Sequence, residues 1–358
     1  MQRKAGSVDP YISVVVTAYN RRRYLPEALR SLERQTLDKT KFEVVVVKNF
    51  EDPASDEIIR RNGWRWVYSN EKSLGPFTLA GIEEARGDVI AFLDDDDVYL
   101  SNKLSIVYDK FKNLKDLLYL HHAFYEVDET GKIIGRHPTD INKDLYIKDE
   151  LKRDPRLKVP LTQAIFFKYD AISYSSTIAV RREPIETYLK PLLERILFVP
   201  DSALFALSLI SNGDLLLLSE PLVLRRLHGE NVSFGTDVYT RKRLRYRWGI
   251  DHKFLTAVLD KASSLFNITR WIYITNLSEY MTFPKLGDED QLPKLRPGHD
   301  ELRSLLQLLN DRSFSDKQHL TLLLGVAINL LIASMPDKIK WKYVKLRYVL
   351  ASKGYPPP

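Results

Sequence analysis

Cysteine is absent from the 358-residue sequence. Its absence excludes disulfide bonds, thiolate zinc sites and thiol catalysis, and it is compatible with a reducing compartment. The sequence also lacks a Walker-type glycine loop and a Gly-x-Gly-x-x-Gly fingerprint, which argues against kinase-like and dinucleotide chemistry. No apolar run reaches the about twenty residues that a membrane-spanning helix needs. A hydrophobic content of 44% still allows a sizeable core, and the length suggests two domains or one large domain with an appendage.

Acidic residues are fewer than basic ones: the sequence has 47 Asp and Glu and 54 Lys and Arg, which gives a formal net charge of +7. This excess favours an anionic partner, which could be nucleic acid, anionic lipid or a phosphorylated substrate. Near the amino terminus, the apolar run at 12–18 gives way at once to Tyr19-Asn20-Arg21. That run is too short, and too polar behind, for a signal peptide. It therefore predicts a first strand in a cytoplasmic protein.

Short apolar segments alternate with amphipathic ones from residue 11 to about 125, which is typical of a parallel or mixed sheet covered on both faces by helices. Ligands of open α/β sheets bind at the carboxyl ends of the strands, so polar residues there are candidates for a binding site. The expected strands are 11–17, 42–47, 65–68 and 88–93, and the expected helices start at Pro26 and span 56–62 and 74–85. The polar residues that follow these strands are Thr17, Tyr19, Asn20, Asn49, Asp52, Asn70 and four aspartates.

The four aspartates occupy positions 94–97, directly after the strand expected at 88–93. Adjacent carboxylates repel one another, so this arrangement costs stability unless a cation or the hydroxyls of a ligand lie among them. Hard oxygen ligands are the kind that Mg²⁺ and Mn²⁺ prefer. We therefore predict the active centre here. A solvated acidic turn, the alternative, would more often follow a polar linker than a buried strand.

Three segments, taken in order, resemble the family 2 glycosyltransferases with the GT-A fold. They are VVVTAYN at 14–20, LPEALRSL at 25–32, and GIEEARGD running into FLDDDD between 81 and 97. Their order and spacing are specific together, and the resemblance covers about residues 10–235. It implies a Rossmann-like mixed α/β sheet flanked by helices. It also implies an inverting, metal-dependent transfer of a sugar from a UDP- or GDP-sugar to a hydroxyl of a glycan or a lipid-linked acceptor of the polyprenyl phosphate type.

The resemblance also implies roles for the residues at the strand ends. Asp96 would hold the metal, Mg²⁺ or Mn²⁺, while Asp94 and Asp97 would lie against the donor sugar and its diphosphate. Tyr19 would offer its aromatic face to the base, and Asp95 would face the ribose. The full set expected to bind the nucleotide is Thr17, Tyr19, Asn20, Asn49, Asp52 and Asp95.

Two places depart from the family's pattern. The second strand usually ends in paired aspartates, one of which accepts a hydrogen bond from the base, whereas residues 48–52 here read KNFED. In the helix before the acidic motif, Thr78 replaces a basic residue and Leu79 stands where an amide is usual. Base recognition is therefore altered, and the sequence leaves uridine and guanosine open.

Asp201 precedes an apolar helix expected at 203–211. An acid at this place is often a helix cap, and the neighbouring Ser202 strengthens that interpretation. In the resembled family, an acidic residue here is the general base for the acceptor hydroxyl, although the usual preceding glutamate is Pro200 in this sequence. We therefore predict Asp201 as the catalytic base, a role that capping would not exclude.

Residues 220–233, EPLVLRRLHGENVS, match the stretch that closes the family's catalytic domain. By that match, His228 would approach the metal or the diphosphate, with Arg225 or Arg226 helping to hold the diphosphate. His228 follows a strand and precedes a glycine turn that could aim it inward. By contrast, His121 and His122 are neighbours on an expected strand and point to opposite faces, so a structural role is favoured over metal binding.

Between the acidic motif and Asp201, strands are expected at 117–125, 132–136 and 172–180. They are separated by a charged loop at about 143–161, which is long for a compact domain. A loop of this length is usually functional or disordered. We interpret it as an acceptor-side lid, with a floppy insertion as the alternative.

The family resemblance ends where the composition changes, which divides the chain into a GT-A domain at 1–236 and a helical module at 237–358. Basic and aromatic residues are interleaved at 241–248 and 338–348, a mixture typical of nucleic-acid or lipid-headgroup binding. The apolar stretch at 320–335 favours an anionic membrane surface over nucleic acid, with an ordinary solvated helical cap as the alternative. We therefore expect a peripheral protein on the inner face of the cell membrane.

Three other functions remain open. A non-catalytic scaffold that binds nucleotide sugars is kept open by Asn49 and Thr78, which depart from the family's pattern. A nucleotidyltransferase would share the sheet and the metal but would release inorganic diphosphate. A nucleic-acid binder would explain the basic segments, yet no recognisable helix-turn-helix or single-strand-binding module accompanies them.

Overall fold

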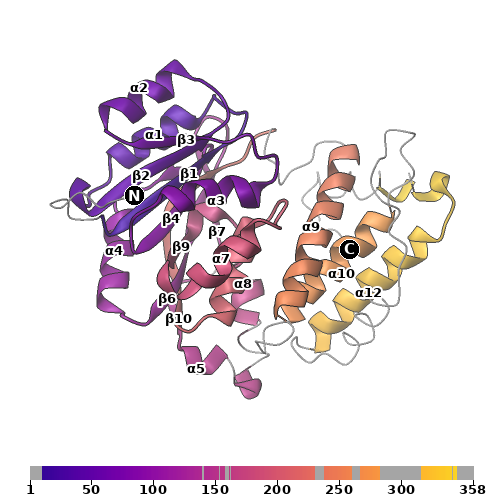
Figure 1. Ribbon diagram of the computed structural model, residues 1–358. Coiled ribbons are helices and arrows are strands. Elements are labelled where there is room, and N and C mark those ends of the chain that lie inside the picture. The colour runs from indigo at the N-terminus through magenta and orange to yellow at the C-terminus, as the bar shows by residue number, and fades with distance from the viewer. Residues whose placement is uncertain are drawn as a thin grey trace. The chain divides into compact units, whose positions relative to one another are not determined.

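The computed structural model describes residues 10–138, 141–152, 154–157, 161, 163–229, 238–259, 267–282, 316–340 and 342–344. The chain divides into two compact units (Figure 1). The first comprises Met1–Arg153 and Ala164–His228, and the second comprises Asp154–Gln163 and Gly229–Pro358. The domain boundary expected at residue 236 lies outside the described residues.

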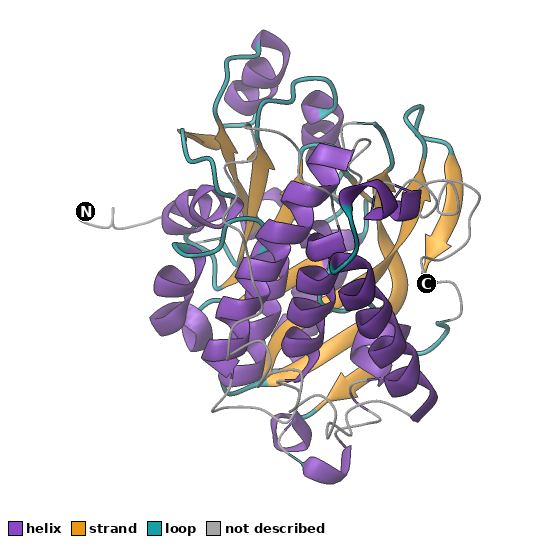
Figure 2. Ribbon diagram, turned by 90° about the vertical axis from the view of Figure 1, so that its right-hand side faces the viewer, coloured by secondary structure: helices purple, strands orange, loops and turns teal. Residues whose placement is uncertain are grey.

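A ten-stranded mixed sheet forms the centre of the first unit (Figure 2). Its strands are β1 (Ile12–Ala18), β2 (Phe42–Lys48), β3 (Arg65–Tyr68), β4 (Val89–Asp94), β5 (Val98–Tyr99), β6 (Leu117–Val127), β7 (Ile133–His137), β8 (Leu145–Ile147), β9 (Ile178–Arg181) and β10 (Asp214–Arg226). The order is β3-β2-β1-β4-β9-β6-β10-β5, with β7 paired to β6 and β8 to β10. Strands β1 to β4 are mutually parallel, so their carboxyl ends meet at one edge of the sheet.

One face of the sheet carries alternate valines of the first two strands, such as Val14 and Val44. Side chains at every second position of a strand share a face, so these valines form one apolar surface. Apolar residues of three helices pack on it and complete a single core. These helices are α1 (Leu25–Glu33), α2 (Pro53–Arg61) and α4 (Lys103–Asn113).

The opposite face of the sheet is covered first by α3 (Leu74–Glu84), which packs against β1 and β2. A Cβ atom at Gly81 would come within 2.5 Å of Val15 Cγ1 and 2.7 Å of Val47 Cγ2, so this close approach requires glycine. The helices that continue this layer are α7 (Glu186–Leu193) and α8 (Pro200–Ile210).

The strand expected at 172–180 is much shorter in the structure. Ser175–Thr177 form a 3₁₀ helix, and the chain becomes extended only at Ile178. Tyr174, just before the 3₁₀ helix, has a φ of +69°, a left-handed conformation that a strand cannot contain. The prediction was wrong here because a turn interrupts an otherwise strand-like composition.

The charged loop expected to form a lid is partly structured. Strand β8 pairs with β10, and a short helix, α5 (Asp149–Lys152), follows it. The fully buried Lys152 donates hydrogen bonds from Nζ to the carbonyls of Ser208, Ser211 and Gly213, at 2.9, 3.0 and 2.7 Å. This part of the segment is therefore packed into the domain, and the lid interpretation does not apply to it.

The second unit is helical in the part that the structure describes. Its helices are α9 (Val238–Leu259), α10 (Asn267–Thr282) and α12 (Asp316–Ala333). Helix α10 packs against both α9 and α12. The small core between α10 and α12 consists of Tyr273, Ile274, Leu277 and Val326. Among the described helices of the whole chain, none is both long and apolar enough to cross a membrane.

Candidate active site

The acidic motif lies at the carboxyl end of β4, beside the end of β1. Thr17 and Asp94 are partners in the parallel ladder, and Thr17 Oγ1 donates a hydrogen bond to Asp94 Oδ1 at 3.1 Å. The backbone N–H of Asp95 donates to the carbonyl of Thr17, also at 3.1 Å. The sheet register therefore places the acidic motif and the end of the first strand in one site, as the sequence predicts.

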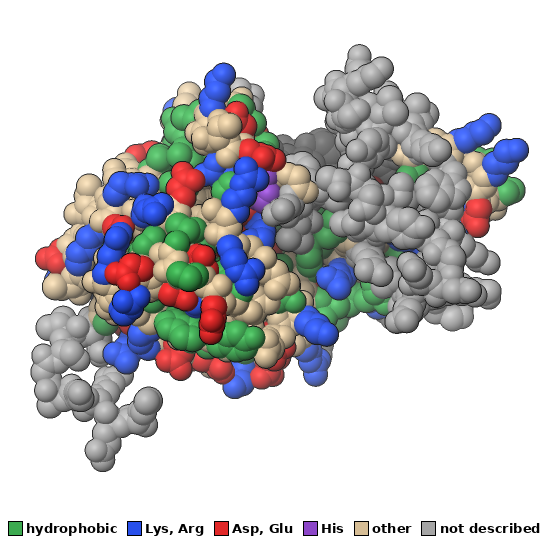
Figure 3. Space-filling view, turned by 90° about the horizontal axis from the view of Figure 1, so that it is seen from above, with side chains coloured by type: hydrophobic (Ala, Val, Ile, Leu, Met, Phe, Trp, Pro, Cys, Tyr) green, Lys and Arg blue, Asp and Glu red, His purple; other side chains and the backbone are tan. Residues whose placement is uncertain are grey.

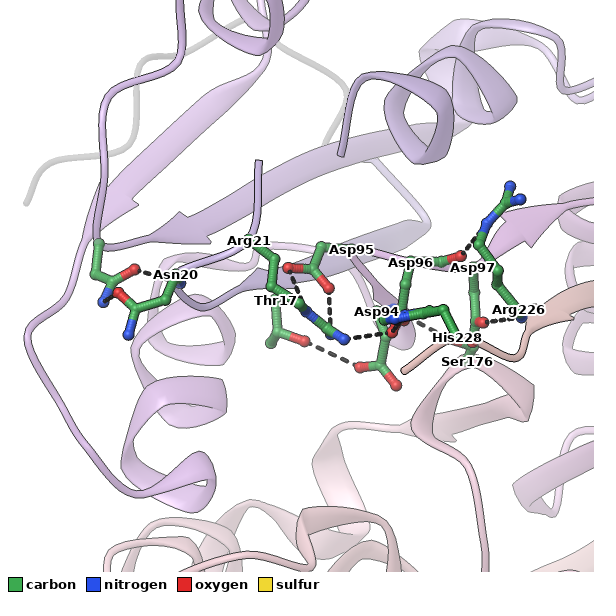
Figure 4. A network of polar contacts seen from close by, with 11 residues as sticks. Thr17, Asn20, Arg21, Asp94, Asp95, Asp96, Asp97, Ser176, Arg226 and His228 are labelled. Atoms are coloured by element: carbon green, nitrogen blue, oxygen red, sulfur yellow. Dashed lines mark hydrogen bonds and ion pairs between the residues drawn. The ribbon is translucent and has the colours of Figure 1, made fainter. Parts of the chain in front are cut away.

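The guanidinium of Arg21 lies among the carboxylates (Figure 4). It forms ion pairs with Asp95 and with Asp96, where Nη1 is 2.6 Å from Asp96 Oδ2. Arg21 is not among the site residues that the sequence predicts. The sequence feature that could have predicted its role is its position as the first cation after β1. In the structure it follows Asn20, whose φ of +58° turns the chain at the sheet edge.

Asp96 and His228 are in direct contact although they are 132 residues apart in the sequence. His228 Nε2 lies 3.0 Å from Asp96 Oδ2, both side chains are buried, and the His228 ring packs against Tyr24. Burial favours the protonated acid, but the hydrogen bond from His228 and the charge of Arg21 lower the pKa of Asp96 below its ordinary value. Asp96 is therefore an anion that faces two nitrogen donors.

The other three aspartates of the motif, Asp94, Asp95 and Asp97, have raised pKa values. Burial raises the pKa of Asp94 and of Asp97 to about 7, and the negative charge of Asp96 adds to both shifts. Lys103, which the sequence analysis missed, is fully buried nearby and donates from Nζ to the carbonyl of Ser176. Its ammonium also lies 3.6 Å from the centroid of the Tyr99 ring. Burial lowers the pKa of Lys103, which the charges of Asp97 and Asp94 oppose.

The two arginines expected at the diphosphate face protein groups. Arg226 Nη2 donates to Glu27 Oε2 at 2.7 Å, and its backbone N–H donates to Asp97 Oδ1 at 3.1 Å. Arg225 Nη1 donates to Glu126 Oε1 at 3.2 Å, and its guanidinium lies over the Tyr174 ring. Arg226 is 2% exposed, so it supports the backbone of the acidic motif from within the domain.

The remaining residues expected at the nucleotide lie at the ends of β1 and β2. Asn20 and Asn49 form a reciprocal pair, in which the Asn20 N–H donates to Asn49 Oδ1 and Asn49 Nδ2 donates to Asn20 Oδ1, both at 2.8 Å. The Tyr19 ring packs edge-on against Phe77, with the ring centroids 5.5 Å apart. Asp52 accepts from the Ser55 N–H at 3.1 Å and is the N-cap of α2. Asp52 thus has a structural role at this edge, whatever else it binds.

Asp201 lies in the first turn of α8, but it is not the helix cap. The N-cap is Val199, and Asp201 Oδ2 accepts from the N–H of Tyr174 at 2.9 Å. Burial raises the pKa of Asp201 to about 6, although hydrogen bonds from the Ser202 and Tyr174 backbone lower it. The charge of Asp201 also contributes, as the smallest of the causes, to the raised pKa of Asp94.

The histidine pair on β6 is bonded to the backbone. His121 Nε2 lies 3.1 Å from the carbonyl of Ser173, and His122 Nδ1 lies 2.7 Å from the carbonyl of Ala123. Both rings are buried, and burial lowers the pKa of His121 to about 4. These contacts agree with the structural role predicted for the pair. Within the described part of the chain, no group of three or more His, Asp or Glu side chains is arranged to hold a metal ion.

Residues 13–189 match Glycosyl transferase family 2. This part of the chain is a family 2 glycosyltransferase domain, which the order of its motifs predicts. Over 130 residues the chain is 31% identical to an uncharacterized glycosyltransferase of Rickettsia bellii, a match that covers 35% of this chain and 18% of that protein. Over 178 residues it is 29% identical to an uncharacterized glycosyltransferase of Methanocaldococcus jannaschii, covering 46% of this chain and 61% of that protein. The chain thus spans less than two thirds of these relatives.

The fold is also similar to that of residues 1–349 of S. aureus TarS in complex with UDP, with a TM-score of 0.55 and 16% identity. That match covers 93% of this chain and 91% of the TarS chain. At this level of identity the similarity shows the fold alone. It confirms the predicted GT-A-like architecture, a mixed α/β sheet flanked by helices and followed by a helical region.

Proposed function

We propose that this protein transfers a sugar from a nucleoside diphosphate sugar to an acceptor hydroxyl, with inversion at the anomeric carbon and with Mg²⁺ or Mn²⁺ as cofactor. The observation that carries the proposal is the contact between Asp96 and His228 at the carboxyl edge of the sheet, where β1 also ends. Ligands of open α/β sheets bind at this edge. The proposal goes beyond the family 2 domain to the activity of the whole protein.

The Asp96 and His228 side chains fit a divalent metal. Asp96 is ionised and offers a carboxylate oxygen, and His228 offers an imidazole nitrogen 3.0 Å away. Sites that bind Mg²⁺ with nucleotides commonly use one or two carboxylates together with the substrate's phosphates, a pattern that Asp96 and a donor diphosphate would meet. A bound ion would neutralise charge on the departing diphosphate.

Asp201 is the proposed general base. Its carboxylate is oriented by the Tyr174 and Ser202 N–H groups, and its pKa of about 6 leaves it mostly ionised at pH 7. In that state it would accept the proton of the acceptor hydroxyl as the oxygen attacks the anomeric carbon. Attack from the face opposite the diphosphate inverts the configuration, and no covalent sugar–enzyme intermediate is needed.

The donor is proposed to be a UDP- or GDP-sugar. Thr17, Tyr19, Asn20, Asn49 and Asp95 lie at the ends of adjacent parallel strands, which is where a nucleotide would bind. TarS, which shares the fold, has been crystallised with UDP and with UDP-GlcNAc. A UDP-sugar is therefore the first donor to test, with a GDP-sugar as the second.

The acceptor is proposed to be a glycan or a lipid-linked saccharide of the polyprenyl phosphate type, reached at an anionic membrane surface. On α12, Leu320, Leu324, Ile328 and Leu331 are 58, 53, 41 and 58% exposed. Their spacing of three or four residues places them along one side of the helix, as in helices that lie on membranes. By contrast, Figure 3 shows Lys and Arg of the first unit interspersed with Asp and Glu, which does not favour nucleic acid on that face.

Calorimetric titration of UDP and GDP, each with and without Mn²⁺, tests the donor site. We expect one nucleotide to bind only when Mn²⁺ is present, and turnover of its sugar conjugate to release a nucleoside diphosphate. Release of inorganic diphosphate would instead indicate a nucleotidyltransferase. Binding without any turnover, over a panel of glycan and lipid-linked acceptors, would indicate a scaffold.

A further inference from the structure

The Arg21 guanidinium contacts the two aspartates that are expected to face the ribose and the metal. Nη1 lies 2.6 Å from Asp96 Oδ2, while Nη2 and Nε face the two oxygens of Asp95, with Nε 3.4 Å from Asp95 Oδ2. The Asp95 and Asp96 side chains are 1% and 8% exposed and that of Arg21 is 20% exposed. These ion pairs are thus poorly screened by solvent.

A single oxygen, Asp96 Oδ2, receives two nitrogen neighbours. Arg21 Nη1 lies 2.6 Å from it and His228 Nε2 lies 3.0 Å from it (Figure 4). A metal ion placed between His228 Nε2 and the Asp96 oxygen that it contacts would lie at this same oxygen. The metal and the guanidinium, both cations, would therefore compete for Asp96.

We propose that Arg21 is the internal counter-cation of the donor site. Arg21 pairs with Asp96 in the free protein, releases this carboxylate when the metal binds it, and then pairs with the donor diphosphate. This inference rests on the proposed function and assigns to Arg21 a step that the family match does not supply. Arg21 precedes α1 and lies in neither a helix nor a strand, so its side chain can change partners without disturbing the sheet. A guanidinium binds phosphate oxygens through two parallel N–H groups, which suits it to a diphosphate.

The new pairing would act on catalysis as well as on binding. When the bond between the sugar and the diphosphate breaks, the bonding electrons leave with the diphosphate, which gains a negative charge. A guanidinium already placed at the diphosphate stabilises that charge more than the charge of the intact donor. Arg21 would thus contribute more to the transition state than to donor binding.

The test separates two affinities that Arg21 should affect in opposite directions. The first is the affinity for Mn²⁺ alone, measured from the electron paramagnetic resonance signal of free Mn²⁺. The second is the affinity for UDP, or GDP if that is the ligand, at saturating Mn²⁺. For Arg21→Gln we expect Mn²⁺ alone to bind roughly tenfold tighter, and the nucleotide to bind roughly tenfold more weakly, as typical coupling energies imply.

Arg23→Gln is the matched control. It removes one positive charge two residues away, and Arg23 is exposed and paired with Glu129, so both affinities should stay at the wild-type values. Arg21→Lys is the second variant and covers a failure of Arg21→Gln to fold. Lysine keeps the positive charge but lacks the two parallel N–H groups of a guanidinium. Mn²⁺ alone should therefore bind as in the wild type, while the nucleotide should bind more weakly.

A fall in both affinities of Arg21→Gln, or no change in its affinity for Mn²⁺ alone, would overturn the role of Arg21. With Arg21→Lys, unchanged nucleotide binding would do the same. These outcomes are distinct from a failure of the proposed function. If the wild-type protein transfers sugar normally but Arg21→Gln behaves like Arg23→Gln, the Arg21 inference alone is rejected. If the wild-type protein neither binds a nucleotide nor turns over a donor, the proposed function itself fails.

Discussion

The carboxylate of Asp201 accepts a hydrogen bond from the backbone N–H of Tyr174, at 2.9 Å from Oδ2. Tyr174 has a φ of +69°, so a residue in an uncommon conformation presents its N–H to the carboxylate. This backbone N–H holds the orientation of the carboxylate, and no side-chain donor is needed for that contact. Because this contact holds the Asp201 side chain in one orientation, the property that should vary with conditions is its protonation state.

Activity should depend on pH through Asp201. A general base works as the anion, and burial raises its pKa to about 6, so the active fraction falls as pH drops through 6. We expect kcat/KM to be nearly constant above pH 7 and to fall roughly tenfold per pH unit below 6. Rates at saturating metal between pH 5 and 8 measure this. A flat profile down to pH 5 would exclude a base with this pKa.

Asp201→Asn should remove transfer while donor binding is retained. Asparagine keeps the size and can still accept from the Tyr174 N–H, but it cannot accept a proton. We expect kcat to fall by roughly a hundredfold to ten-thousandfold, the usual contribution of a general base. Calorimetry of the nucleotide with Mn²⁺ should give the wild-type affinity. Transfer at the wild-type rate would leave Asp201 as a structural residue at the start of α8.

Asp96→Ala should abolish metal-dependent donor binding. The substitution removes the carboxylate that contacts both His228 and Arg21, and turnover should fall by roughly two to four decades. Asp109→Asn is the control, since Asp109 is an exposed acid on α4. Equal nucleotide affinity with and without Mn²⁺, in wild type and Asp96→Ala alike, would exclude the metal role.

Lys103→Met should destabilise the first unit. Lys103 Nζ is fully buried and donates to the carbonyl of the buried Ser176, and methionine would leave that carbonyl without this donor. We expect the free energy of unfolding to fall by about 1–3 kcal/mol, the usual cost of leaving a buried hydrogen-bonding group without its partner. Urea titration measures it, and Lys115→Met, at an exposed lysine, is the control. A loss below about 1 kcal/mol, typical of surface substitutions, would contradict this account.

The α12 stripe, which is the row of exposed residues Leu320, Leu324, Ile328 and Leu331, should determine binding to anionic membranes. Leu324→Gln with Leu331→Gln removes two exposed leucines, and sedimentation with vesicles containing phosphatidylglycerol should weaken by roughly tenfold or more. Ile133→Gln with Ile134→Gln is the matched control, because these residues are also more than half exposed but lie on β7. Equal sedimentation of all three proteins would show that the stripe does not bind lipid.

The sequence predicts the centre of the first unit well. Strands β1 to β4 lie within one or two residues of their expected positions, because their apolar runs are short, continuous and bounded by polar residues. The motifs of the sequence also single out both members of the contact between His228 and Asp96, while their roles at a metal or a diphosphate stay predictions. Both results rest on signals that are contiguous in the sequence.

Other parts of the site carry no such signal. Lys103 lies at the start of a helix, where a lysine usually faces solvent, and only the packed fold shows that it is buried. The left-handed conformation of Tyr174 is rare for a bulky residue, so no local rule predicts where β9 begins. The contacts of Arg21 depend on its side-chain conformation, which the sequence does not encode locally.

The buried Lys152 side chain anchors one end of α8. It binds carbonyls at the carboxyl end of α8, while Asp201 lies in the first turn at the other end. A helix of 11 residues is about 16 Å long and moves nearly as a rigid body. The Lys152 contacts at its carboxyl end therefore restrict how its amino-terminal end can move. We therefore expect the position of the Asp201 carboxylate to depend on Lys152, a residue that lies a full helix length away.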